Sequence, residues 1–390
     1  MLNRVTHLRA VALLVVGSLT CAPLTSLAAP GATARRTSKA GSKARSSVGA
    51  HSASTTRRAA RPAPAVPTLA NSAKGDDSAY DDPVVRQAAL AALGPYNGSV
   101  VALDPNNGRI LSIVNQKLAF SSGFIPCSTI KPVIAVAALE EGVVTRDTMI
   151  SVAPRRYLNL VEALAHSNNA FFEELGRRMG FDTVSRYARL LGLGELAGYN
   201  LPEENPGALP SEPPRNGGVA RMSSFGEGIQ ITPLQLASVA ATLANGGTIY
   251  YLQYPRSEAE KEHFAPRVKR RLDIESLLPD IRDGMLAAVM YGTARRSYEG
   301  DEGEQLLGKT GTCSDSASHV GWFVSYADQL HPKIVVAVLM RGHSVMDTGP
   351  RAAEIAGRMY RKLNQANYFV GVKAAVMPRV VSASTSASGG

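Results

Sequence analysis

The sequence predicts a mixed α/β domain of the α+β kind, in which an antiparallel sheet is flanked by helices and joined by a helical lobe. Strand-like runs rich in β-branched residues occur near both ends of the domain, at 98–112 and 320–340. The middle of the chain carries helical patterns, which indicates a separate helical lobe. About 300 residues remain for this unit, near the upper size of a single domain. We therefore expect one domain of two lobes with an active site between them.

The strand-like segments are expected to form one sheet. The first runs from Gly98 to Ser112, and Asn106-Asn107-Gly108 supplies the residues that a tight hairpin turn favours. Two later segments, 320–326 and 333–340, are rich in valine and other apolar residues. Strands from both ends of the domain would then lie side by side.

A first motif, Ser128-Thr129-Ile130-Lys131, precedes the apolar, alanine-rich segment 132–141. This segment predicts a buried helix, because proline is tolerated in the first turn and the rest is apolar. Ser128 is therefore expected at a helix N-terminus.

Two further motifs follow in order. Ser167-Asn168-Asn169 lies between helical patterns at 160–164 and 170–175, which predicts a turn between two helices. Lys309-Thr310-Gly311 precedes the strand at 320–326 across a polar Ser/Asp turn, which predicts one strand of a hairpin.

Together the first two motifs have the residue types of nucleophilic catalysis. A serine hydroxyl such as that of Ser128 is a poor nucleophile until a base takes its proton. Lys131, three residues on, shares its helix face, and burial would lower its pKa enough to make it that base. Ser167 would relay protons to the leaving group, and the amide of Asn169 would both donate to and accept from a peptide-like substrate.

The third motif is suited to binding a substrate carboxylate. Lys309 supplies positive charge, and the hydroxyls of Thr310 and Thr312 supply donors. Gly311 would let a substrate backbone lie close to the strand. The N–H groups of Ser128 and Thr312 are expected to form an oxyanion hole, worth about 3 to 4 kcal/mol per donor.

Beyond these motifs, most of residues 78–377 resembles the transpeptidase domain of penicillin-binding proteins, which belong with the serine β-lactamases to one superfamily. The resemblance is carried by the three motifs and by Gly98–Ser112, Gly226–Ala237, Leu243–Gly247, Gly292-Thr293-Ala294 and Gly308–Thr312. It implies the β-lactamase/transpeptidase-like fold. It also implies a penicillin-binding D,D-transpeptidase or D,D-carboxypeptidase that acts on D-Ala-D-Ala stem peptides of peptidoglycan through a Ser128 acyl-enzyme, with β-lactams as covalent inhibitors.

The chain departs from the family pattern in two ways. Ser167 follows Ser128 by only 39 positions, which predicts a trimmed helical lobe. Cys127 immediately precedes the serine and Cys313 immediately follows Thr312. If the strand of the third motif packs beside Ser128, the two cysteines come within disulfide reach, and certain carbapenem-hydrolysing class A β-lactamases resemble this arrangement. We expect a disulfide in preference to two buried thiols, and we expect the third cysteine, Cys21, to stay unpaired.

The N-terminus has the features of an export signal. Arg4 and Arg9 precede an apolar run, and Ser26-Leu27-Ala28 offers small residues for cleavage. Residues 1–28 are expected to be a cleaved signal peptide, with a retained inner-membrane anchor as the alternative. The domain is therefore expected in the periplasm or cell envelope.

Composition predicts disorder on either side of the domain. Residues 29–77 form a basic Ala/Ser/Pro linker, and 378–390 form a polar tail. The linker is expected either to be a solvated tether or to contact membrane lipid or wall polymers.

The net charge of +10 does not indicate a nucleic-acid partner. Eleven basic residues lie before residue 76, which leaves 31 basic residues (42 minus 11) against 32 acidic ones, a net of −1 for the remainder. No basic face is predicted. The seven histidines form no metal-binding pattern, so neither a metal nor another cofactor is expected.

Other functions stay open at this stage. A serine β-lactamase would need a base for deacylation, and Glu203 and Glu204 lie where such a base would be sought, in a Glu-Glu-Asn-Pro-Gly run that is more similar to penicillin-binding proteins. A β-lactam- or muropeptide-sensing module is the competitor from another class. His166 beside Ser167 suggests a Ser-His triad, but Lys131 already supplies a base. Trp322 and Phe323 are expected in the core.

Overall fold

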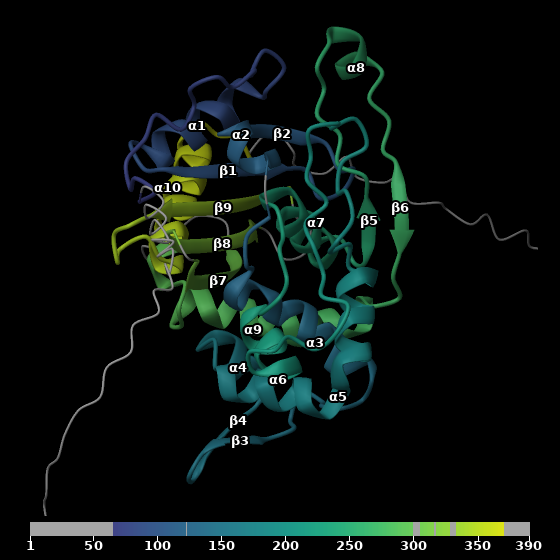
Figure 1. The fold of residues 1–390 in the computed structure, drawn as a ribbon. Coiled ribbons are helices and arrows are strands. Elements are labelled where there is room, and N and C mark those ends of the chain that lie inside the picture. Colours follow the sequence, from purple (N-terminus) through teal and green to yellow (C-terminus); the bar gives the residue numbers. More distant parts are fainter. Residues whose placement is uncertain (1–64, 122, 299–304, 316, 328–332, 370–390) are drawn as a thin grey trace, which may run out of the picture. The chain divides into compact units, whose positions relative to one another are not determined.

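A five-stranded antiparallel sheet, in the order β2-β1-β9-β8-β7, forms the centre of the fold (Figure 1). The computed structural model describes residues 65–121, 123–298, 305–315, 317–327 and 333–369. The strands are β1 (Gly98–Leu103), β2 (Ile110–Val114), β7 (Leu306–Ser314), β8 (His319–Ala327) and β9 (Ile334–Gly342). Every neighbouring pair is antiparallel, which confirms the expected sheet class.

The strands come from the segments that the sequence indicated. β1 and β2 form the first hairpin, and Gly108 in its turn has a φ of 78°, a value that glycine adopts at little cost. β7 and β8 form the second hairpin, with Lys309 opposite Val324. β9 then pairs with both β8 and β1, so that the last of the described strands joins the first hairpin to the second.

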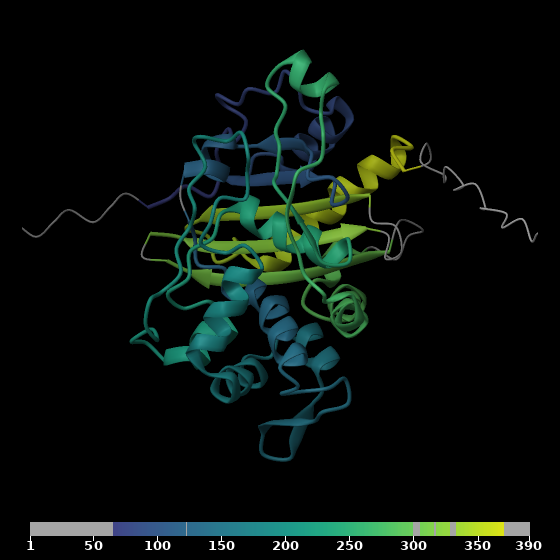
Figure 2. The same ribbon diagram turned by 90° about the vertical axis from the view of Figure 1, so that its right-hand side faces the viewer.

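The sheet separates two apolar clusters. On one face, α1 (Pro83–Leu93) and α10 (Gly349–Gln365) pack against inward-facing residues such as Val338. On the other face, α7 (Pro233–Ala244) packs over residues such as Leu339. The alternation of side chains along a strand explains why adjacent residues enter different clusters. Figure 2, viewed from the side of α7, shows α10 behind the sheet.

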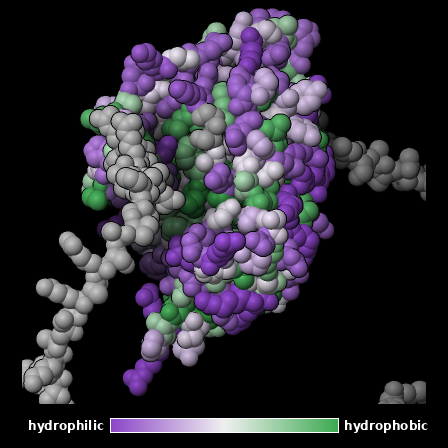
Figure 3. Space-filling view, in the orientation of Figure 1, coloured by the Kyte–Doolittle hydropathy of each residue, from purple (hydrophilic) through white to green (hydrophobic). Residues whose placement is uncertain are grey.

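A group of helices lies beyond the β7 edge of the sheet (Figure 1). It comprises α3 (Lys131–Glu140), α4 (Leu160–Ala165), α5 (Asn169–Leu190), α6 (Gly218–Phe225) and α9 (Leu278–Met290). The helices expected at 132–141, 160–164 and 170–175 are all present. On the face shown in Figure 3, hydrophilic residues predominate over this helical side, with hydrophobic residues among them.

Shorter elements complete the described residues. They are α2 (Gln116–Ser121), β3 (Ile150–Ala153), β4 (Arg156–Leu158), β5 (Thr248–Tyr250), α8 (Glu258–Glu262), β6 (Val268–Arg271) and the 3-10 turns η1 (Cys127–Ile130), η2 (Glu275–Leu277) and η3 (Arg295–Ser297). β3 pairs with β4, and β5 pairs with β6, in separate two-stranded sheets. None of the helices within the described ranges has the length and apolar character needed to cross a bilayer.

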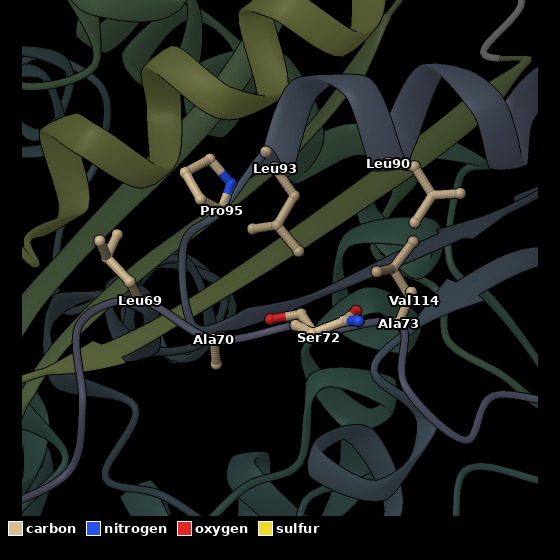
Figure 4. Close-up of a pocket in the computed structure, with 10 residues that line it drawn as sticks. Leu69, Ala70, Ser72, Ala73, Leu90, Leu93, Pro95 and Val114 are labelled. Carbon is tan, nitrogen blue, oxygen red and sulfur yellow. The ribbon is translucent and has the colours of Figure 1, made fainter.

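The chain before α1 packs against the domain. Ser72 is buried and donates to the Tyr96 carbonyl at 2.8 Å, and Asp76 pairs with Arg86 at 2.7 Å. With Leu90 of α1, this segment lines a cavity of about 550 Å³ (Figure 4). The part of the expected linker from 65 to 77 is therefore ordered here, because local polar contacts hold it where no periodic apolar pattern exists. The expected leader 1–28, the earlier linker and the tail 378–390 lie outside the described residues.

Candidate active site

Ser128 lies in η1, the 3-10 turn that leads into α3, as the first motif predicted. The preceding Cys127 has a φ of 51°, so the backbone turns sharply just before the serine. Trp322 of β8 donates its Nε1–H to the Ile125 carbonyl at 2.9 Å. This bond ties the approach to Ser128 to the sheet. Trp322 and Phe323 are fully buried, in agreement with the expected core positions.

Lys131 lies at the centre of the three motifs. Its side chain is fully buried, and its Nζ donates to Ser128 Oγ and to Asn169 Oδ1, both at 2.7 Å. The same Nζ lies 3.0 Å from the Ser167 carbonyl and 3.2 Å from Ser167 Oγ. Because Lys131 uses Asn169 Oδ1, the amide of Asn169 keeps its N–H donors for another partner.

Ser167 occupies the turn between α4 and α5, as expected, with a φ of 53°. Asn168 caps α5 by accepting the Phe171 N–H at 2.9 Å, which fixes the turn. His166 is exposed, and its Nε2 lies 3.3 Å from Glu162 Oε2 one turn back on the helix. The His166 ring also lies 5.8 Å from the ring of Tyr291, so its described side-chain contacts are with Glu162 and Tyr291 rather than with either serine.

Lys309 reaches the same centre from β7. It is fully buried, and its Nζ donates to Ser167 Oγ at 2.8 Å and to the Thr310 carbonyl at 3.0 Å. A Cβ at the adjacent Gly311 would lie 2.9 Å from the Pro126 carbonyl. The structure therefore gives a second reason for this glycine, which is the close packing of β7 against the turn that carries Ser128.

The hydroxyls of Thr310 and Thr312 on β7 each contact a polar group from another part of the chain. Thr310 is buried, and its Oγ1 lies 2.7 Å from the Oγ1 of Thr293. Thr312 is exposed, and its Oγ1 accepts the Gly349 N–H at 2.9 Å. The Gly349 bond uses an acceptor position of Thr312, so the hydroxyl hydrogen remains available to donate.

Burial governs the electrostatics of both lysines. Desolvation, and next to it the positive charge of Lys309, lower the pKa of Lys131 well below its usual value, while Glu173 opposes the shift. Desolvation lowers the pKa of Lys309 to about 7. Burial therefore favours the uncharged amine at Lys131 more than water does.

Cys127 and Cys313 flank this centre, as the sequence indicated. Their Cα atoms are 5.7 Å apart and their sulfur atoms are at disulfide distance. The pair links η1 to β7. Both of the amide groups expected to form an oxyanion hole, those of Ser128 and Thr312, lie next to this link in the sequence.

Glu203 and Glu204 have structural partners. Glu204 is buried and accepts the N–H groups of Ala197 at 2.9 Å and Gly198 at 2.7 Å. Desolvation raises its pKa, while these two hydrogen bonds oppose the shift. Glu203 pairs with Arg256 at 2.7 Å. Among the described residues, no group of three or more His, Cys, Asp or Glu side chains is arranged to hold a metal.

Sequence reasoning missed Thr293 as a member of the site. The Gly292-Thr293-Ala294 motif was noticed for its resemblance, but nothing in the sequence placed its hydroxyl against Thr310. Glu173, which opposes the pKa shift of Lys131, was also missed. Its position four residues after Asn169, on the same helix face, was the available signal.

The geometry permits a specific sequence of proton movements. A neutral Lys131 amine, 2.7 Å from Ser128 Oγ, can accept the hydroxyl proton. Ser167 Oγ lies within reach of both lysines and can pass a proton onward. Lys309 and the hydroxyls of Thr310 and Thr312 can together receive an anionic group. These are the requirements of acyl transfer to a serine.

Comparisons with known proteins agree with this chemistry. The family model described as penicillin binding protein transpeptidase domain matches residues 98–361. Stage V sporulation protein D of Bacillus subtilis is 28% identical over 328 residues, which cover 70% of this chain and 50% of that protein. The chain thus spans half the length of this relative.

Two further proteins are similar over a larger share of their length. Peptidoglycan D,D-transpeptidase PbpA of Mycolicibacterium smegmatis is 28% identical over 355 residues, which cover 71% of this chain and 70% of that protein. The solved structure of penicillin-binding protein A from M. tuberculosis, an imipenem acyl-enzyme complex, superposes with a TM-score of 0.60 at 25% identity. It covers 72% of this chain and 78% of that chain.

Proposed function

We propose, because the chain belongs to the penicillin-binding protein transpeptidase family, that it is a serine D,D-transpeptidase or D,D-carboxypeptidase acting on D-Ala-D-Ala stem peptides of peptidoglycan. The observation that carries the proposal is the 2.7 Å contact between Lys131 Nζ and Ser128 Oγ, in a buried setting that favours the neutral amine. This contact supplies the activated nucleophile that acyl transfer needs.

The proposed reaction begins when Lys131 takes the proton of Ser128. The Ser128 oxygen attacks the carbonyl of the D-Ala-D-Ala bond, and the N–H groups of Ser128 and Thr312 stabilise the oxyanion. Ser128 lies in the first turn of a helix, where amide hydrogens lack intrahelical partners, and Thr312 lies on the edge strand β7. Ser167 then returns the proton to the departing D-Ala amine, which leaves an acyl-enzyme.

Substrate binding would use the two sides of the centre. Lys309, Thr310 and Thr312 would bind the terminal carboxylate, and the free donors of Asn169 would bind the peptide on the opposite side. Gly311 keeps β7 close to Ser128. An amine acceptor would complete transpeptidation, and water would complete carboxypeptidation. β-Lactams would acylate Ser128 in the same way, because they present a strained amide and a carboxylate.

A β-lactamase is the second candidate, and the position of Glu204 argues against it. Its carboxylate is buried, and each of its oxygens accepts a backbone N–H, which supports a structural role for this residue. A sensing module that becomes acylated without turnover remains the competitor from another class. It would share the Ser128 adduct but would lack peptidase activity.

The compartment follows from the cysteines and the expected leader. Cys127 and Cys313 at disulfide distance support a disulfide, which persists in oxidising compartments. We therefore assign the domain to the periplasm or cell envelope, exported by residues 1–28 as a signal peptide or as a membrane anchor. Contact of the basic linker with membrane lipid or wall polymers is part of the same proposal.

The test is intact mass spectrometry of the purified protein incubated with penicillin for hours, with Ser128→Ala as the matched control. We expect a single persistent adduct on the unaltered protein and none on Ser128→Ala. Incubation with a stem pentapeptide, with and without an amine acceptor, then separates an enzyme from a sensor. A transient adduct with accumulating hydrolysed penicillin would establish a β-lactamase, and an absence of any adduct would refute acyl-enzyme chemistry.

A further inference from the structure

Thr293 connects two walls of the candidate site. It lies between α9 and η3, and its backbone N–H donates to the Ala165 carbonyl at 3.1 Å, two residues before Ser167. Its Oγ1 lies 2.7 Å from Thr310 Oγ1 on β7. One residue thus touches both the turn that carries the second motif and the strand that carries the third.

The loop that holds Thr293 is fixed by its backbone rather than by this side chain. The neighbouring N–H groups of Gly292 and Ala294 donate to the carbonyls of Ala287 at 3.0 Å and Ala288 at 2.8 Å. A Cβ at Gly292 would collide with the Ala165 carbonyl, so the loop lies directly against the α4 turn. The Thr293 hydroxyl can therefore be removed without removing the bonds that shape the loop.

The direction of the hydrogen bond between Thr293 and Thr310 decides where the Thr310 hydroxyl hydrogen can point. A hydroxyl has one hydrogen to donate, and a buried hydroxyl without a fixed partner rotates to whichever acceptor is near. If Thr293 donates to Thr310 Oγ1, the hydrogen of Thr310 is directed elsewhere, and donation into the hydroxyl also strengthens its own donation. The Gly349 N–H has the same relationship to Thr312, two residues along β7.

We infer that Thr293 is a positioning residue, which donates to Thr310 and thereby orients the Thr310 hydroxyl toward the substrate carboxylate. This inference rests on the proposed function, because it assigns the carboxylate of the substrate or β-lactam to Thr310. Thr293, which lies outside all three motifs, would thus help the third motif to recognise the negative charge of the ligand.

The experiment compares two ligands that differ in the carboxylate alone, penicillin G and its methyl ester. Acylation of the purified protein is followed over a range of concentrations, which separates the saturation constant from the limiting rate constant. The variants are Thr293→Val, which keeps the shape but removes the hydroxyl, and Thr293→Ser, which restores it. Thr148→Val is the matched control, because Thr148 forms a comparable hydroxyl pair with Thr145 at 3.0 Å in an exposed loop.

We expect Thr293→Val to raise the saturation constant for penicillin G by about three- to tenfold, which is the effect expected for one lost hydrogen bond. Acylation by the methyl ester should stay within about twofold of the unaltered protein, and Thr293→Ser should regain most of the loss. Thr148→Val should match the unaltered protein for both ligands. Thermal unfolding of each variant shows whether the fold is retained.

Two results would overturn the inference. Equal losses for penicillin G and its ester would mean that Thr293 only supports the fold, and unchanged kinetics in Thr293→Val would mean that its hydroxyl orients nothing of consequence. Failure of the proposed function is seen separately, because the unaltered protein itself would then form no Ser128 adduct with either ligand, and the inference would fall with it.

Discussion

Lys131 of α3 and Lys309 of β7 reach the same hydroxyl, with their Nζ atoms 3.2 Å and 2.8 Å from Ser167 Oγ. Both side chains are fully buried, so each ammonium loses its hydration and also repels the other. The fold therefore disfavours two charges at this point. One neutral and one charged lysine is the combination that the proposed chemistry needs.

The first prediction is a bell-shaped pH profile for acylation by penicillin. The rate should rise with pH as Lys131, whose pKa is lowered by burial, becomes a neutral base, and it should fall once Lys309 loses the charge that binds the carboxylate. The two apparent pKa values belong to the coupled pair. Acylation rates measured from about pH 5 to 9 test this, and a flat profile would contradict it.

The second prediction concerns stability and Lys309. Its pKa of about 7 in the folded protein is below the usual 10.5, so the unfolded chain holds more protons between these values. Stability should therefore rise with pH across that window, by up to about 1.4 kcal/mol per pH unit for one group. Lys309→Met removes the buried amine, so this variant should be more stable near neutral pH. Its free energy of unfolding should also change less with pH in this window.

Urea unfolding of both proteins at several pH values measures that difference. The difference between the two curves reports the titration of Lys309 together with its effect on the pKa of Lys131, because the remaining titrating groups are common to both proteins. Parallel curves would show that folding does not lower the pKa of Lys309.

The third prediction concerns the cysteine pair. The unaltered protein should weigh about two daltons less than its reduced form, and Cys127→Ala with Cys313→Ala should lose about 2 to 4 kcal/mol of unfolding free energy. Acylation should also slow, because the pair links η1 to β7. Cys21→Ser in the full chain is the control and should keep the mass deficit. A deficit that disappears in Cys21→Ser would indicate a different pairing.

The fourth prediction concerns Glu204. Glu204→Gln replaces an acceptor of two backbone N–H groups, so unfolding free energy should fall by about 1 to 2 kcal/mol. The lifetime of the penicillin adduct should not change, because Glu204 has no role in deacylation. Mass spectra recorded during adduct decay provide the measurement. A markedly longer lifetime in Glu204→Gln would mean that this carboxylate activates water after all.

Local signals were sufficient for much of the fold. The strands β8 and β9 are mostly apolar runs, and the turn at Gly108 uses residues of the usual hairpin chemistry. The motifs were also placed correctly, since Ser128 begins a helix and Ser167 lies between two. These features depend on periodicity and capping residues, which are signals between residues only a few positions apart in the sequence.

Features that depend on distant contacts could not be predicted. Thr68 donates to Asp347 at 2.8 Å, and the hydroxyls of Thr293 and Thr310 meet across the gap between α9 and β7. Gly311 illustrates the same limit, because its need for a missing Cβ arises from Pro126 rather than from its own strand. Such constraints exist only once the strands have been placed.

The pairing of β1 with β9 has a consequence for how this molecule matures. Ala102 lies opposite Val336, so the middle of the sheet joins the beginning and the end of the folded chain. Contacts between such distant segments slow folding, because a large loop must close before they form. A partly synthesised chain that lacks β9 has no completed sheet on which β7 can be set against Ser128. During folding, the ability to be acylated should therefore appear late and in a single step, after β9 has paired with β1.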